Sequence, residues 1–101
     1  HLPVLISAAL LKTASHERNR EISDLAKLLA SSGFEDTTRV GGGNPQLGTA
    51  MASNNSGPLL KVLAAYRFSL EQIEEAILEE NWKQLEAELK LTKSIRSEFI
   101  G

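Results

Sequence analysis

The feature that most constrains the fold is an apolar stripe at helical spacing in the second half of the chain. Within 58–80 its members step by 4, 3, 4, 3 and 4 positions: Leu59, Leu63, Tyr66, Leu70, Ile73 and Ile77. Such spacing gives a long helix one apolar seam, which suits packing against other helices. No stretch shows the period-two alternation with β-branched residues that is typical of strands. The sequence therefore predicts an all-α fold, a bundle of about five helices in one domain spanning residues 1–101.

The other helices are expected at about 3–14, 18–31 and 45–54, with a last one from residue 81. Gly33 is expected to end the second helix as a left-handed C-cap. Asn44-Pro45 has the pattern of an N-cap followed by proline at the first helical position. The first helix is apolar nearly all round, so we expect it to be buried in the core or in a subunit interface. The expected inward-facing residues of the later helices are Leu47, Ala50, Met51, Trp82, Leu85, Leu89 and Phe99.

Between the second and third of these helices lies the stretch with most potential for chemistry. Arg39 is the first candidate, because a guanidinium can hold a carboxylate through two parallel hydrogen bonds. Asp36 lies one helical turn earlier and could orient that guanidinium or pair with a cation across a subunit boundary. The simpler alternatives are a surface arginine near a helix end and a loop-stabilising Asx turn.

The run Gly41-Gly42-Gly43 frees the backbone for positive φ or for close approach to a ligand. It matches neither the dinucleotide fingerprint nor the P-loop, which need other glycine spacings and, in the P-loop, a Lys-Ser/Thr pair. The helix N-terminus at Asn44-Pro45 could still attract an anion, and a plain turn is the alternative. We therefore expect this stretch to bind an anionic substrate.

The two histidines give a weaker signal. His1 could contact substrate or transfer a proton, or it could be a packed residue or simply the cut end of the chain. His16 lies in a polar turn and is expected to be solvated. Isolated histidines and scattered carboxylates lack metal-ligand spacing, so no metal site is expected.

Composition excludes several classes of function. The net charge is −2 without a basic stripe, which argues against nucleic acid as a partner. Cysteine is absent, so there are no disulfides or thiolate metal sites, and a cytoplasmic location is compatible with this composition. No apolar run reaches the length of a membrane span, and no signal peptide is visible. The chain opens on apolar, helix-like residues, so we expect it to be a fragment whose first helix begins upstream.

Three motifs, in order along the chain, resemble a known family. They are His1-Leu2-Pro3, the run Gly33-Phe34-x-Asp36-Thr37-Thr38-Arg39, and Asn44-Pro45. Together they resemble the C-terminal helical domain of the prephenate/arogenate dehydrogenases, over nearly the whole chain. The resemblance implies a homodimerisation domain that closes the substrate cleft of an NAD- or NADP-dependent oxidative decarboxylation in tyrosine biosynthesis. It also implies that the cofactor and the catalytic histidine belong to a missing N-terminal Rossmann domain, so this domain alone is expected to be inactive and to hold no cofactor.

The resemblance also assigns roles to residues. Arg39 would bind a substrate carboxylate, and Asp36 would join an ionic network near the subunit boundary. Gly43 would lie against the substrate, and His1 would line the cleft.

Two departures from the family pattern favour arogenate over prephenate as the substrate. Many prephenate-using members have a second histidine where this chain has Val4, and a tryptophan where it has Gly48. Without these groups, recognition of the pyruvyl carboxylate is weakened. The alternative to an enzyme fragment is an autonomous helical interaction module, in which the apolar seam binds a partner helix and Arg39 is incidental.

Overall fold

The structure is a computed structural model that describes residues 2–15, 19–30 and 33–100. Over these residues the chain is all-α, as predicted, with no strand and with one α-helix more than the roughly five expected. The elements are α1 (Leu2–Ala14), α2 (Arg20–Ala30), α3 (Gly33–Thr38), the 3-10 helix η1 (Arg39–Gly42), α4 (Pro45–Asn54), α5 (Ser56–Leu78) and α6 (Trp82–Ile100).

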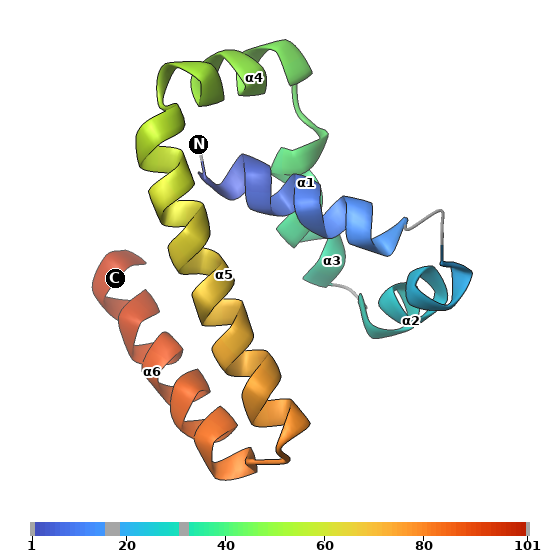
Figure 1. Ribbon diagram of the computed structural model, residues 1–101, viewed down its shortest axis with the longest axis vertical. Coiled ribbons are helices and arrows are strands. Elements are labelled where there is room, and N and C mark those ends of the chain that lie inside the picture. The colour runs from blue at the N-terminus through green and yellow to red at the C-terminus, as the bar shows by residue number, and fades with distance from the viewer. Residues whose placement is uncertain (1, 16–18, 31–32, 101) are drawn as a thin grey trace. The chain divides into compact units, whose positions relative to one another are not determined.

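The chain divides into two compact units, residues 1–61 and 62–101, and α5 runs from the first into the second. In the first unit α1 is the central element, and α2, α3 and η1 all pack against it (Figure 1). Helix α4 follows η1 after a short extended link at Gly43 and Asn44. The elements that pack against α1 therefore include Asp36 and Arg39, and Gly43 lies in the link that follows them.

The 33–42 stretch is helical, which corrects the expectation of a loop after a C-cap at Gly33. Gly33 has no positive φ and instead opens α3. The hydroxyls of Thr37 and Thr38 donate to the carbonyl oxygens of Gly33 and Phe34 at 2.8 and 2.7 Å. Glu35 and Asp36 in the first turn place negative charge at the positive end of the helix. These local interactions hold a short helix where glycine and threonine residues suggested a turn.

The predicted N-caps are confirmed. The side-chain oxygen of Asn44 accepts from the backbone N–H groups of Gln46 and Leu47 at 2.9 and 3.2 Å. That of Asn81 accepts from the N–H of Gln84 at 3.1 Å. From the sequence, Gln84 three residues after Asn81 resembles the second half of a capping box. Its side chain donates to Glu88, however, and the N–H of Asn81 donates to the carbonyl oxygen of Ala76, so only the first half of the box forms.

The sequence Asn54-Asn55-Ser56-Gly57 predicts a break, with Pro58 as the first residue of the next helix, and the observed break is shorter. Only Asn55 separates α4 from α5, and Pro58 is the third residue of α5 and not its first. Proline is tolerated there because the first turn of a helix has no intrahelical acceptors for its N–H groups.

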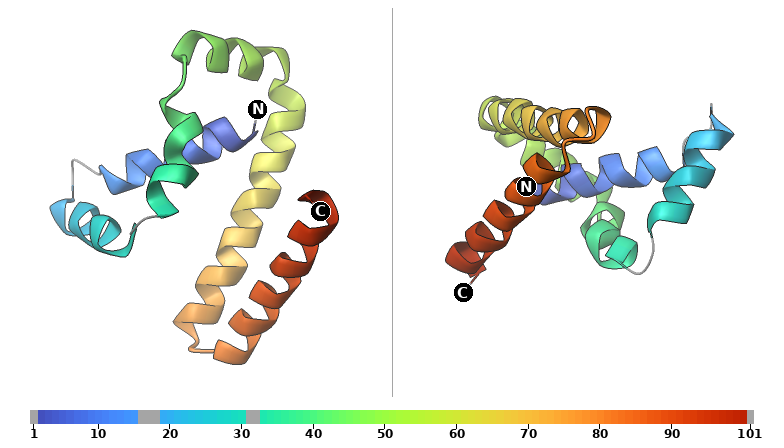
Figure 2. Two further views of the ribbon diagram at one scale, coloured as in Figure 1. Left: turned by 180° about the vertical axis from the view of Figure 1, so that it is seen from behind. Right: turned by 90° about the horizontal axis from the view of Figure 1, so that it is seen from below.

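The turn between α5 and α6 has the hydrogen bonds of a Schellman motif. The N–H of Asn81 donates to the carbonyl oxygen of Ala76 at 2.8 Å, and that of Glu80 to Ile77 at 3.0 Å. Glu80 has a φ of 54°, the left-handed conformation that glycine usually supplies at this position. From this turn the two helices separate, as the right view of Figure 2 shows.

Few side chains are buried among the described residues. The buried apolar ones are Ala14, Leu59 and Ala76, and the buried polar ones are Ser7 and Thr38. Several residues expected to face inward are exposed instead: Leu47, Ala50, Trp82, Leu89 and Phe99. Met51 and Leu85 are half-buried, and α1 is buried only at Ser7 and Ala14, its other residues being half-buried or exposed. Leu28 and Leu29 fall on the apolar stripe that the sequence predicts for the helix at 18–31, and their side chains lie outside the described part of the chain.

The apolar seam of α5 is also largely uncovered. Leu59 is buried, whereas Leu70 and Ile77 are about half exposed. The pattern correctly located the helix and its apolar face, but this chain alone does not cover that face. Among the described helices, none combines the length and apolar character needed to cross a membrane.

Candidate functional site

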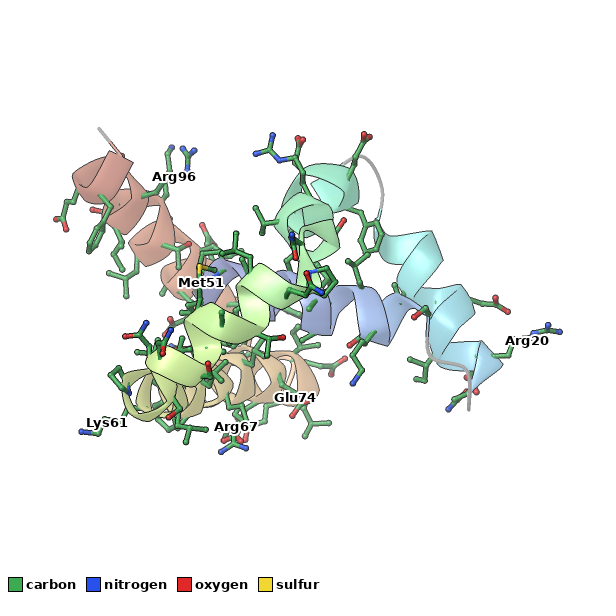
Figure 3. The ribbon with its side chains drawn as sticks, turned by 90° about the horizontal axis from the view of Figure 1, so that it is seen from above. Arg20, Met51, Lys61, Arg67, Glu74 and Arg96 are labelled. Atoms are coloured by element: carbon green, nitrogen blue, oxygen red, sulfur yellow. The ribbon has the colours of Figure 1, made fainter. Side chains whose placement is uncertain are left out.

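A cavity of about 590 Å³ lies in the first unit, between the first half of α1, η1 with the link that follows it, and α4. This is within the size range of small-molecule sites. Met51, labelled in Figure 3, belongs to its α4 wall. No charged side chain is among the described residues that line it. Most of the wall would therefore contact the apolar part of a ligand, and a charged group of the ligand would need a partner from elsewhere.

The polar side chains on the cavity wall are already engaged in holding α4. The side-chain oxygen of Asn44 caps the helix, and the hydroxyl of Thr49 donates to the carbonyl oxygen of Pro45 at 2.8 Å. These bonds fix the start of α4 and reduce the polar character of the wall.

Val4 and Gly48, the two positions interpreted from the resemblance as departures, lie on this same cavity. A Cβ atom on Gly48 would be 3.7 Å from Cγ1 of Val4, which is ordinary van der Waals contact. The two departures, far apart in the sequence, thus change one place on the wall. Neither residue supplies a charge or a side-chain hydrogen bond there.

Of the two expectations for the glycine run, positive φ or close approach to a ligand, the first is wrong. None of Gly41, Gly42 and Gly43 has a left-handed backbone. Gly41 instead allows close approach, because a Cβ atom there would lie 2.6 Å from Oγ of Ser7 and 2.8 Å from the backbone nitrogen of Ala8. The partner in that approach is α1 and not a ligand. Gly43 lies on the cavity wall, and its contact with a substrate stays a prediction.

Arg39 is the first residue of η1, and its side chain is exposed. It does not itself line the cavity, although the next two residues, Val40 and Gly41, do. Asp36 is exposed on α3. Within the described chain no ion pair joins Asp36 to Arg39, so the expected mutual orientation is not formed in a single chain. Both side chains are available to groups outside it.

His1 and His16 both lie outside the described residues, so their predicted roles stay predictions. Among the described residues, no group of three or more His, Cys, Asp or Glu side chains could hold a metal ion.

Ser7 is the residue that sequence reasoning missed. Its hydroxyl accepts a hydrogen bond of 2.8 Å from the N–H of Gly41, and it is 1% exposed. One signal was available in the sequence, since Ser7 is a small polar residue within an otherwise apolar stretch of helix. Its partner, 34 positions away, could not be inferred from spacing.

Comparison with known proteins gives two matches and one negative result. The family model "Prephenate dehydrogenase, dimerization domain" matches residues 1–91. The crystal structure of Synechocystis arogenate dehydrogenase is similar, with a TM-score of 0.86 and 47% sequence identity over 99% of this chain. The match covers 36% of that protein, so this chain spans little more than a third of its length. No curated protein sequence matches the chain.

Proposed function

Since the chain belongs to the family of prephenate dehydrogenase dimerization domains, we propose that it is the substrate-binding and dimerisation part of an NAD(P)-dependent arogenate dehydrogenase. The reaction oxidises the carbinol carbon of the substrate ring and releases carbon dioxide, which leaves an aromatic ring, as in tyrosine biosynthesis. The 47% identity with Synechocystis arogenate dehydrogenase supports this proposal over that of an autonomous interaction module. We propose a cytoplasmic location as well, with which the absence of cysteine from the sequence is compatible.

The observation that carries the choice of arogenate is the cavity wall at Val4 and Gly48. Prephenate has a pyruvyl side chain, whose keto and carboxylate oxygens need donors or a cation. Arogenate carries its own ammonium beside the side-chain carboxylate, so it depends less on a cationic protein group. A wall with Val4 Cγ1 opposite Gly48 offers neither donor nor charge. This wall therefore favours arogenate.

In this proposal Arg39 binds a substrate carboxylate. Its guanidinium is exposed and makes no ion pair within the described chain, so its hydrogen-bond donors remain available to an anion. Gly43 lies against the substrate, and the absence of a side chain keeps that part of the wall open. Asp36 joins an ionic network at the subunit boundary, and His1 lines the cleft.

The cofactor, NAD or NADP, is bound outside this chain. Dinucleotide sites place the pyrophosphate at a turn between a strand and a helix. The described residues form no strand, and the glycine run lies in and just after a 3-10 helix. These residues do not fit a dinucleotide, so we expect the domain alone to be inactive and the catalytic base to belong to an N-terminal cofactor domain.

A second copy of the chain is proposed to cover its exposed apolar surface. Large apolar side chains are uncovered along α5 and α6, and they include Phe68, Leu70, Trp82, Leu89 and Phe99. A monomeric protein rarely exposes so many in succession. The dimerisation role of the family supports a homodimer as the arrangement that buries them.

The test is the substrate preference of the complete enzyme. We expect kcat/KM to be higher for arogenate than for prephenate, with either nicotinamide cofactor. A clear preference for prephenate would rule out the choice of substrate. Absence of activity with both substrates would contradict the enzymatic proposal itself.

A further inference from the structure

Ser7 is the most completely buried side chain among the described residues, at 1% exposure. It lies on α1, and its Oγ accepts a hydrogen bond of 2.8 Å from the backbone N–H of Gly41 in η1. A buried hydroxyl or N–H is costly unless it is hydrogen-bonded. This bond therefore satisfies two groups at once and ties η1 to α1 at one point.

The same point is fixed by packing. A Cβ atom on Gly41 would lie 2.8 Å from the backbone nitrogen of Ala8 and 2.8 Å from the carbonyl carbon of Ser7. These are backbone atoms, so no change of rotamer could relieve the overlap. Only glycine permits the approach that makes the hydrogen bond, and the two residues thus determine the contact together.

This contact lies two residues after Arg39. On the other side, Thr38 is buried, and its hydroxyl donates to the carbonyl oxygen of Phe34 at 2.7 Å. The backbone of Arg39 is therefore held from both directions, while its side chain is exposed. This arrangement fixes the backbone position from which the Arg39 side chain extends and leaves its guanidinium accessible to a ligand. Less conformational entropy is then lost when Arg39 is ordered on binding.

We propose that Ser7 is a positioning residue for substrate binding: its buried hydroxyl anchors η1 to α1 and thereby places Arg39 at the substrate carboxylate. This inference rests on the proposed role of Arg39. Ser7 does not touch the substrate in this arrangement, and it acts through Arg39.

The test compares Ser7→Ala in two backgrounds of the complete dehydrogenase, with arogenate as the substrate. In the otherwise unchanged enzyme, Ser7→Ala raises KM about three- to tenfold, the range for loss of one neutral hydrogen bond, and changes kcat less than about twofold. In an enzyme that already carries Arg39→Ala, adding Ser7→Ala changes KM by less than about twofold, because the residue through which it acts is gone.

Thr13→Ala is the matched control. Thr13 is also a hydroxyl residue on α1, but it is exposed and bonds only to the carbonyl oxygen of Ala9 in its own helix. The KM of the enzyme that carries Thr13→Ala is expected to be unchanged. If Ser7→Ala yields too little folded enzyme, Ser7→Cys replaces it, because the thiol fills a similar volume but is a weak acceptor, and the same rise in KM is expected.

The outcomes separate this inference from the proposed function. If Arg39→Ala raises KM and Ser7→Ala does not, the positioning role is wrong and the proposed function stands. If Ser7→Ala raises KM equally in both backgrounds, it acts through general destabilisation, and the inference is again overturned. If Arg39→Ala itself leaves KM unchanged, both the role of Arg39 and that of Ser7 are wrong.

Discussion

Cγ1 of Val4 lies 3.7 Å from the point that a Cβ atom would occupy on Gly48, so the two residues that we interpreted from the sequence as departures from the family pattern meet on one cavity wall. One is on α1 and the other is on α4, 44 positions later. A larger side chain at either position would extend into the same part of the cavity. The substrate preference of the enzyme should therefore respond to a change at either of them.

Val4→His is expected to shift the preference toward prephenate. An imidazole at this position would supply a donor, or a cation when protonated, at a place on the wall where neither Val4 nor Gly48 has a polar side chain. The ratio of kcat/KM for prephenate to that for arogenate should rise by about tenfold, as one charge-assisted hydrogen bond would give. Steady-state kinetics with both substrates measures this ratio.

Val4→Leu is the control for this change, because it alters the volume of the side chain without adding a donor. We expect it to change both kcat/KM values by similar factors and so to leave their ratio unaltered. An equal shift in the ratio with leucine would mean that shape, and not hydrogen bonding, sets the preference.

Arg39→Ala in the complete enzyme is expected to raise KM by an amount equivalent to about 2–4 kcal/mol, as when one partner of a buried charge pair is removed. Stability should change by less than about 0.5 kcal/mol, because the side chain is exposed and unpaired in the described chain. Arg39→Lys keeps the positive charge but cannot bind a carboxylate through two parallel hydrogen bonds, so it should raise KM less than Arg39→Ala does.

Arg20→Ala is the matched control for Arg39. Arg20 is an exposed arginine at the start of α2, and Figure 3 shows its side chain extending away from the ribbon. Its replacement should leave KM unchanged. The assignment of Arg39 to the site would fail if its own replacement had as little effect as that of Arg20.

The sequence predicted best those features that depend on neighbouring residues. Asn44 and Asn81 were recognisable as N-caps because the groups that they bind lie two or three positions away. The stretch after Gly33 was harder, since glycine is compatible with both a C-cap and a helix start. There the hydroxyls of Thr37 and Thr38 donate to the carbonyl oxygens four residues earlier, in a helix that the composition did not indicate.

Features that depend on distant residues could not be predicted. The bond between Ser7 and Gly41 joins positions 34 apart, and no periodicity connects them. Similarly, the pattern identified Trp82 and Phe99 as apolar residues of one helix but could not say what covers them. Arg39 was found because its residue type and the family motif point to it, and its role remains a prediction.

Glu80→Gly is expected to stabilise the protein. Glu80 has a φ of 54°, and a left-handed conformation costs a residue with a Cβ atom about 1–2 kcal/mol, part of which glycine loses again through the entropy of the unfolded chain. The net gain should be about 0.5–1 kcal/mol, measured as the free energy of unfolding in urea. Glu79→Gly has no positive φ to relieve and should be neutral or destabilising, so equal stabilisation by both changes would contradict this explanation.

The chain by itself is expected to form a dimer, because its exposed apolar side chains exceed what a small monomer leaves in water. Sedimentation at micromolar concentration measures this, and a well-folded monomer would contradict it.

Leu70→Glu places a charge within the half-exposed seam of α5 and should weaken the dimer by at least about tenfold in Kd, since an unpaired charge would be buried on association. Lys93→Glu changes a residue of α6 that is exposed and already charged, so it should leave Kd nearly unchanged. If both variants dimerise as tightly as the parent chain, the seam of α5 is not part of the interface, and another surface must hold the two copies together.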